Sequence, residues 1–231
     1  MQYMKSIAVY TVIFGKYDQL RPVSIVGDAD YICFTDEEMD APEPWQLKVV
    51  DMPHPDVRFA TRYYFDQSTV VLPEYEYTIM HSGNKVLRVL PETLLKYLED
   101  TDIASFRHPN RSSIYKEYQM ILLNEYDTKE NMLPQLHRYK KEGFSGSPLS
   151  ACTLLIRRNT PAIRELEKLW WHEVSNGSHR DQLSFDYARW KLGVPITYIE
   201  GDVFRSPIMK RWRHIHARRH KKTLQRQENV T

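Results

Sequence analysis

The sequence is poor in the residues that define several protein classes. Among its 231 residues there are only two cysteines, Cys33 and Cys152, and 8 glycines. Two cysteines are too few for the disulfide framework of a small secreted domain, and they lack the paired spacing of a zinc site. Both lie inside apolar runs, so we predict buried free thiols. The composition is otherwise that of an ordinary globular protein, which excludes collagen-like and disordered chains.

Long hydrophobic runs are missing as well. The apolar stretch at residues 1–15 is far shorter than the ~20 residues that a membrane-spanning helix needs, and it has no small-residue signal cleavage site. Its alternating β-branched and aromatic residues instead predict a first buried strand. We therefore expect a cytoplasmic protein without a transmembrane segment, and association with a membrane surface stays open.

Glycine-rich phosphate loops are the third absence. Gly15 follows the first predicted strand, but the sequence around it matches neither G-x-G-x-x-G nor G-x-x-x-x-G-K-[ST]. Neither a Rossmann dinucleotide site nor a P-loop is indicated. The spacing alone favours a simple turn at Gly15.

What the chain does contain is an alternation of strand-like and helix-like segments. The predicted strands are 6–14, 31–35, 46–50, 75–80, 102–106, 151–156 and 195–199. The predicted helices are 56–71, 91–99, 111–124, 129–141, 161–174 and 180–192. Strands that alternate with helices predict one α/β domain, residues 1–202, whose mostly parallel central sheet is flanked by helices.

Residues 203–231 are predicted to form a basic C-terminal tail. No acidic residue lies between Val203 and Gln227, and the nine basic residues there are Arg205, Lys210, Arg211, Arg213, Arg218, Arg219, Lys221, Lys222 and Arg226. Because the net charge of the whole chain is only +2, the remainder is acidic. Such a tail is typical of proteins with an anionic partner, and a solvated terminus without a specific role is the alternative.

Three polar segments follow the ends of predicted strands. They are residues 15–18, Asp36 and residues 81–84. In open α/β sheets, ligands bind beyond the carboxyl ends of parallel strands, so we expect these segments on one rim. That rim is the natural place for a nucleotide.

Two pairs of basic side chains are candidate anion ligands. Arg58 and Arg62 are four residues apart and share one face of the predicted helix, where two guanidiniums suit a diphosphate. A solvated helix face is the alternative. His108 and Arg111 link a strand end to a helix start, where they could contact a substrate anion or brace the helix.

The segment His179–Phe185, HRDQLSF, is the most informative. Ser178 is a plausible N-cap, which would place Asp181 in the first helical turn. A carboxylate there can complement the helix dipole, or it can act as the base that deprotonates an acceptor hydroxyl.

Taken together, these segments resemble a family of glycosyltransferase-like proteins known mainly as a domain of unknown function. It has bacterial, viral and plant members, some of the plant members being linked to cell-wall or mucilage polysaccharide synthesis. The matching stretches run in order through roughly residues 6–202: IAVYTVIFGKYDQLRP, DYICFTD, RFATRYY, LPEYEYTIMHSGN, FRHPNRSSIYKE, RYKKEGF, LLIRRNTPAIRELEKLWWHEV and HRDQLSF. The RDQLSF and HPNR motifs are the most specific.

The resemblance implies a GT-A-like, Rossmann-like fold and a nucleotide-sugar donor, such as a UDP-sugar. The catalytic residues that it implies are Asp181, Arg180 and His108. The donor-binding residues that it implies are Gly15, Tyr17, Asp36, Arg58, Arg62, Ser82, Gly83, Asn84, Arg111 and Gln182. The metal ligands that it implies are Asn84, His214 and His216.

Two positions depart from the family pattern. Family members carry I-W-I-D-G-N where this chain has Ile79–Asn84, so Ser82 replaces an acidic residue that commonly holds Mn²⁺ or Mg²⁺. Phe65 stands where a lysine is expected after R-Y-Y. Three accounts remain: a metal held by Asn84, a histidine and water; a metal-independent site neutralised by arginines and the basic tail; or lost catalysis.

We therefore expect a glycosyltransferase, hexosyl or pentosyl, and the alternative is a non-catalytic homologue that binds a nucleotide-sugar or glycan. The expected acceptor is a glycan or a lipid-linked saccharide. DNA with a hydroxylated base is a second acceptor class, because the basic residues 205–226 could bind phosphates. Trp212 could stack on a base, or it could pack the tail onto the domain.

Overall fold

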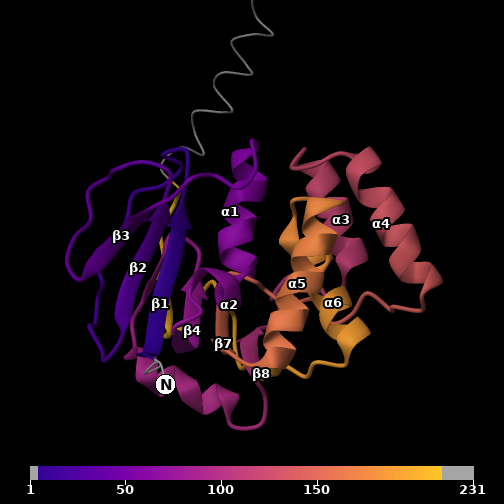
Figure 1. Cartoon of the computed structure of the whole chain (residues 1–231). Helices are drawn as coiled ribbons and strands as arrows, with labels where there is room; N and C mark the ends of the chain where they lie inside the picture. Colours follow the sequence, from indigo (N-terminus) through magenta and orange to yellow (C-terminus); the bar gives the residue numbers. More distant parts are fainter. Residues whose placement is uncertain (1–4, 215–231) are drawn as a thin grey trace, which may run out of the picture.

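The computed structural model describes residues 5–214, and a seven-stranded sheet runs through its middle (Figure 1). The strand order is β3-β2-β1-β4-β7-β6-β8. The bounds are β1 Lys5–Ile13, β2 Asp30–Thr35, β3 Trp45–Val49, β4 Tyr75–His81, β6 Ile103–Phe106, β7 Leu154–Arg158 and β8 Thr197–Ile199. Only β7 runs against its neighbours in this sheet, so the predicted mostly parallel sheet is confirmed.

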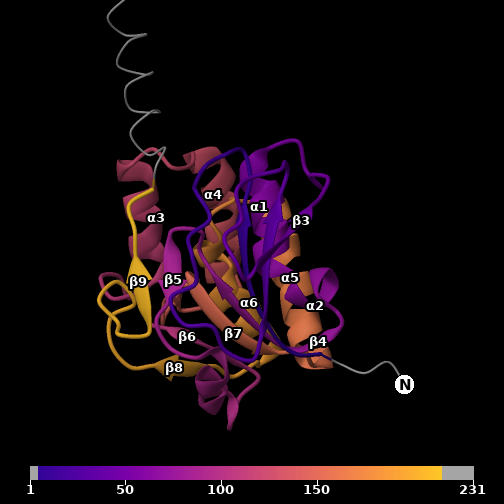
Figure 2. The ribbon, with the colours of Figure 1, turned by 90° about the vertical axis from the view of Figure 1, so that its left-hand side faces the viewer.

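Helices cover the sheet unequally. The α-helices are α1 Val57–Asp66, α2 Ser68–Val71, α3 Ile114–Leu123, α4 Lys129–Lys141, α5 Pro161–Ser175 and α6 Phe185–Leu192. The 3-10 helices are η1 Pro91–Leu98 and η2 Asp181–Leu183. In the two ribbon views α1, α2 and α5 pack on one side of the sheet, with α3 and α4 beyond α5 (Figures 1 and 2). Within residues 5–214 no helix combines the length and the apolarity needed to cross a bilayer.

Buried side chains fill both sides of the sheet. One hydrophobic cluster packs strand residues such as Tyr10 against Trp170 of α5 and Phe185 of α6. The cluster on the other side joins Ile79 of β4 to Leu98 of η1. Cys152 and Cys33 are buried and free, as predicted. Burial raises the pKa of the Cys33 thiol to about 12 and that of the Cys152 thiol well above its usual range.

A second, two-stranded sheet was not predicted. It pairs β5, Lys85–Leu87, antiparallel with β9, Met209–Arg211. Ile208 and Met209 are buried in the cluster next to η1. Residues 203–214, assigned to the tail from the sequence, therefore lie against the domain. The remaining basic positions of the predicted tail are outside the described residues: Arg218, Arg219, Lys221, Lys222 and Arg226.

The helix predicted over residues 56–71 is broken. The α1 helix ends at Asp66, and Gln67 leaves the helical region with φ −109° and ψ 49°. Beyond the break, Ser68 and Thr69 donate hydrogen bonds to the carboxylate of Glu167 on α5, at 2.5–2.8 Å. A contact with a residue about a hundred positions away thus overrides local helix propensity.

The helix predicted over residues 180–192 is wrong at its start. The chain forms η2 first, and α6 begins only at Phe185. Ser178 is not the N-cap, which is Arg180; the Ser178 hydroxyl accepts from the Arg180 N–H at 3.1 Å and donates to Asp127. Asp181 therefore opens a 3-10 turn rather than an α-helix.

Candidate active site

The loops after β1 and β2 meet at the upper rim of the sheet in Figure 1. The N–H of Gly15 donates to both carboxylate oxygens of Asp36, at 3.0 and 3.1 Å. Gly15 has φ +59°, a left-handed conformation that costs a glycine little. Gly15 and Asp36, two of the predicted donor-binding residues, are therefore in contact, as expected for residues that follow neighbouring parallel strands.

The segment after β9 adds a histidine to the same rim. Nδ1 of His214 lies 2.5 Å from Oδ2 of Asp18, and Nε2 lies 3.0 Å from the amide nitrogen of Asn84. The Trp212 N–H donates to the Asn84 carbonyl at 2.8 Å, and the Tyr17 ring lies 5.1 Å from that of His214. Two predicted metal ligands, Asn84 and His214, are thus side by side. The third, His216, lies outside the described residues.

The serine at the expected acidic position has a partner of its own. The Ser82 hydroxyl lies 2.9 Å from that of Thr153, and the Ser82 N–H donates to the Thr153 carbonyl. Gly83 sits so close to Ile13 that an added Cβ would meet its side chain at 3.2 Å. Within residues 5–214, no cluster of three or more His, Cys, Asp or Glu side chains could hold a metal ion.

The two arginines of α1 have different partners. Nη1 of Arg62 donates to Oδ2 of Asp181 at 2.9 Å, and both side chains are largely buried. Arg58 is paired instead with Asp56, the N-cap of its own helix, at 2.6 Å, and its side chain is 57% exposed. This pairing lowers the pKa of Asp56 to about 2. The structure therefore joins Arg62, but not Arg58, to the predicted catalytic carboxylate.

A chain of charged side chains extends from Asp181 across the rim. Arg180 lies 3.9 Å from the carboxylate of Glu117, which also accepts from Arg111. Beyond Arg111, Nδ1 of His108 accepts from the backbone N–H groups of Asn110 and Arg111 at 3.2 and 3.1 Å. His108 thus braces the start of the loop. Glu117 was not among the predicted site residues, because a carboxylate in the first turn of a helix looks like an ordinary partner of the helix dipole.

The segment before β7 bridges the two halves of the rim. At one end, Thr153 holds Ser82. At the other, the Ser150 carbonyl accepts from the side-chain amide of Gln182 at 3.0 Å. Ser150 is itself fixed by two hydrogen bonds to the buried carboxylate of Asp186, at 2.6 and 2.7 Å. The segment 150–153 therefore connects the part of the rim around Ser82 to the part around Asp181 through hydrogen bonds.

Two buried histidines at this rim predict acid sensitivity. Burial lowers the pKa of His81 and of His108 from 6.5 to about 4. Both stay neutral in the folded protein, whereas the unfolded chain binds their protons once the pH drops below about 6.5. The free energy of unfolding should therefore be greatest above pH 6.5. It should fall between pH 6.5 and 4, by up to about 3 kcal/mol per histidine.

Urea unfolding at a series of pH values measures this loss. His81→Gln should remove the His81 share of this dependence, because glutamine does not titrate, and His108 should account for what remains. His137→Gln changes an exposed histidine on α4 and is the matched control. An equal dependence in all three proteins would contradict the assignment.

Residues 44–214 match the family model described as TOD1/MUCI70, glycosyltransferase-like domain. A search of curated proteins found no match. Among solved structures, the WbbM bifunctional glycosyltransferase, apo, aligns with a TM-score of 0.51 and 10% identity, over 84% of this chain and 39% of that chain. Mouse xyloside xylosyltransferase 1, apo form, aligns with a TM-score of 0.49 and 8% identity, over 84% and 85%.

These alignments differ in what they show. At 10% identity the likeness to WbbM concerns the fold alone, and it agrees with the GT-A-like α/β architecture predicted from the sequence. This chain spans only 39% of the length of WbbM. The family match is independent of the structure and covers the part of the rim from Arg58 to His214, whereas Gly15, Asp18 and Asp36 precede the matched residues.

Proposed function

Because this chain belongs to the TOD1/MUCI70 glycosyltransferase-like domain family, we propose that it transfers a sugar from a nucleotide-sugar donor to an acceptor hydroxyl. The observation that carries the proposal is the buried pair of Arg62 and Asp181. It places a cation and a carboxylate together at the carboxyl ends of the strands, where α/β sheets bind their ligands.

Donor binding is assigned to the first half of the rim. Gly15, Asp36 and Tyr17 would line the nucleotide, and Arg58 and Arg62 would approach the diphosphate. Arg58 is free to exchange its partner, because an exposed ion pair such as that with Asp56 contributes about 0–1 kcal/mol. A guanidinium gains more from a diphosphate, whose oxygens accept two parallel hydrogen bonds.

Asp181 is the group assigned to the acceptor. In the transfer step, the bond from sugar C1 to the diphosphate oxygen breaks, and its electron pair stays with the diphosphate. The acceptor oxygen forms the new bond to C1. In an inverting reaction, Asp181 takes the proton of that hydroxyl. In a retaining reaction, the leaving diphosphate takes that proton, and Asp181 positions or stabilises the sugar instead. Arg62 is paired with Asp181 and would approach the diphosphate, where it offsets the negative charge that develops on the leaving oxygen.

Asn84 and His214 are the side chains that would hold a divalent cation. Asp18 accepts from Nδ1–H of His214, which leaves Nε2 unprotonated. Nε2 here accepts from the side-chain amide of Asn84, and a cation would replace that hydrogen bond. The amide nitrogen of Asn84 faces His214, so the side chain would have to turn its oxygen to the cation, and water and donor oxygens would have to supply the other ligands. The chemistry that Mn²⁺ or Mg²⁺ supplies there is positive charge beside the leaving diphosphate.

A non-catalytic binding protein is the second candidate. It is favoured by one observation, namely that Ser82 replaces the expected acid and is engaged by Thr153. Such a protein would bind a nucleotide-sugar or a glycan without turnover.

A donor panel tests the proposal. UDP-, GDP-, CMP- and TDP-sugars are screened by thermal shift and by slow donor hydrolysis, each with and without Mn²⁺, and the free nucleotides are controls. We expect one donor to raise the melting temperature and to be hydrolysed, and its identity separates hexosyl from pentosyl transfer. Binding without hydrolysis would favour the second candidate, and no binding at all would overturn both.

A further inference from the structure

A hollow of about 490 Å³ lies beside the candidate active site and has no part in the chemistry above. It is lined by Ser24, Ile25, Arg88 and Lys210. One wall is the loop between β1 and β2; the other is the small β5–β9 sheet, at the left in Figure 2. Its volume is within the ~300–1,000 Å³ typical of small-molecule sites.

Both walls of this hollow are anchored. Arg88 follows β5, and its N–H donates to the Ile208 carbonyl at 2.8 Å. Lys210 is in register with Val86 in the β5–β9 pair. On the loop side, the indole N–H of Trp45 donates to the Arg21 carbonyl at 2.8 Å. The basic side chains are thus mounted on fixed backbone, which favours a preformed site.

The cations here differ from those of the rim in lacking acidic partners. Arg62, Arg111 and Arg180 each form an ion pair with a carboxylate. No ion pair within residues 5–214 involves six cations on and around the β5–β9 sheet, which are Arg21, Lys85, Arg88, Lys210, Arg211 and Arg213. Side chains alternate along a strand, so Arg211 and Lys85 face Phe204, while Lys210 and Arg88 line the hollow. The two like charges in the hollow repel each other, and a bound anion would relieve that repulsion.

Trp212 links this hollow to the active site. Its indole is 39% exposed, and its ring centre lies 5.0 Å from the guanidinium of Arg21 and 4.1 Å from the ammonium of Lys210. Its backbone N–H is bonded to Asn84 on the rim. The two cations lie over the ring, so an anion and the apolar edge of a ligand could meet charges and exposed indole within the same few ångströms.

We propose that the hollow binds an acidic sugar residue of the acceptor glycan, with Arg88 and Lys210 paired to its anionic group and Trp212 beside its ring. The proposal rests on the proposed function, because it gives the acceptor a substrate class. The hollow is open to solvent, and its two lining cations, Arg88 and Lys210, suit the anionic group of one charged residue. A nucleic-acid interface commonly buries about 1,000–2,500 Å² and needs a longer run of phosphate contacts.

Matched oligosaccharides test the proposal on the full chain by calorimetry. Mannuronate and galacturonate trisaccharides are compared with neutral mannotriose and galactotriose, which differ from them in the carboxylates. A 6-phosphorylated mannotriose separates phosphate from carboxylate as the anion, and a ten-residue thymidine oligonucleotide represents nucleic acid. We expect at least one acidic trisaccharide to bind roughly tenfold or more tightly than its neutral counterpart, with an affinity that weakens as salt is added.

The double variant Arg88→Gln/Lys210→Gln should lower that affinity by roughly tenfold or more. The control, Arg164→Gln/Lys168→Gln, removes the same charge from exposed positions of α5 and should bind like the unchanged protein. Equal binding of acidic and neutral sugars, equal losses in both variants, or tighter binding of the oligonucleotide would each overturn the proposal. The assay needs no donor, so its result is separate from that of the donor panel.

Discussion

Asp181→Asn is expected to lower the rate of glycosyl transfer by roughly 10²–10⁴-fold. The asparagine side chain has nearly the same shape and still offers an oxygen to Nη1 of Arg62, so the 2.9 Å contact can persist. It cannot accept a proton, and it no longer balances the charge of Arg62. Donor affinity should change far less than the rate. Initial rates at saturating donor, together with the donor Kd, measure the two effects separately.

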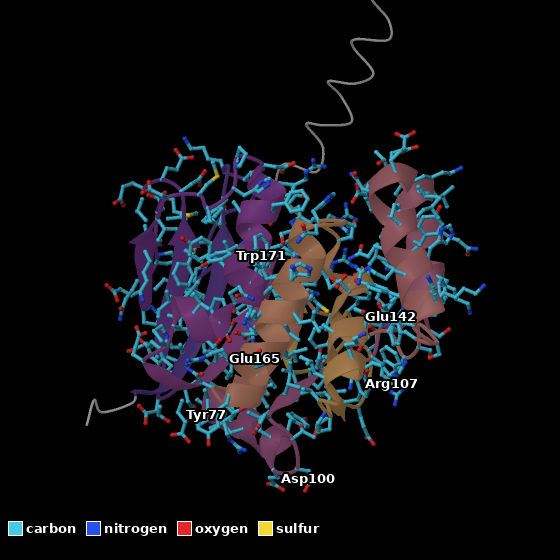
Figure 3. All side chains as sticks on the ribbon, turned by 45° about the vertical axis from the view of Figure 1, so that its right-hand side comes forward. Tyr77, Asp100, Arg107, Glu142, Glu165 and Trp171 are labelled. Atoms are coloured by element: carbon cyan, nitrogen blue, oxygen red, sulfur yellow. The ribbon has the colours of Figure 1, made fainter. Side chains whose placement is uncertain are left out.

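Asp102→Asn is the matched control for this variant. Asp102 is also a carboxylate paired with an arginine, Arg158 at 3.0 Å. It lies at the opposite end of the sheet from the rim, close to Asp100, which is labelled at the bottom of Figure 3. The control should transfer sugar at the unchanged rate. Full activity in Asp181→Asn would mean that the carboxylate only holds Arg62 in place.

The strands of the main sheet could be predicted from sequence because each is a run of β-branched and aromatic residues. All seven predicted strands have a counterpart, although the strand expected at 151–156 lies at Leu154–Arg158. The small sheet could not be predicted in this way. Its strand β9 is Met-Lys-Arg inside a basic run, and without apolar alternation only the partner strand β5 reveals it.

The site was predictable as a location but not as a set of contacts. Strand order and direction bring Gly15 to Asp36, and this follows from the general rule for parallel sheets. The partner of Arg62 could not be predicted in this way, because the sequence offers two carboxylates near a helix end, Asp56 and Asp181. Asp56 binds Arg58 of its own first turn, and only the fold, which packs η2 on α3 and α6, brings Asp181 to Arg62.

Glu167→Gln is expected to destabilise the protein more than any single surface substitution. Glu167 and Arg157 are both fully buried and lie 2.8 Å apart, and Arg157 also donates to the Phe65 carbonyl. Removing the negative charge leaves the guanidinium uncompensated in the core, which typically costs 3–5 kcal/mol. Total stabilities are only about 5–15 kcal/mol, so the loss should be visible as a large fall in the urea midpoint.

The α5 helix carries its own control for this prediction. Glu165, labelled on α5 in Figure 3, is exposed, and Glu165→Gln should leave the midpoint nearly unchanged. The double variant Arg157→Met/Glu167→Leu removes both charges and should recover much of the loss, since apolar residues of similar size often replace buried ion pairs at little cost. If the double variant were as unstable as Glu167→Gln, the hydrogen bonds to Ser68 and Thr69 would be the principal contribution of Glu167. That outcome would place its role in holding the break between α1 and α2 rather than in neutralising Arg157.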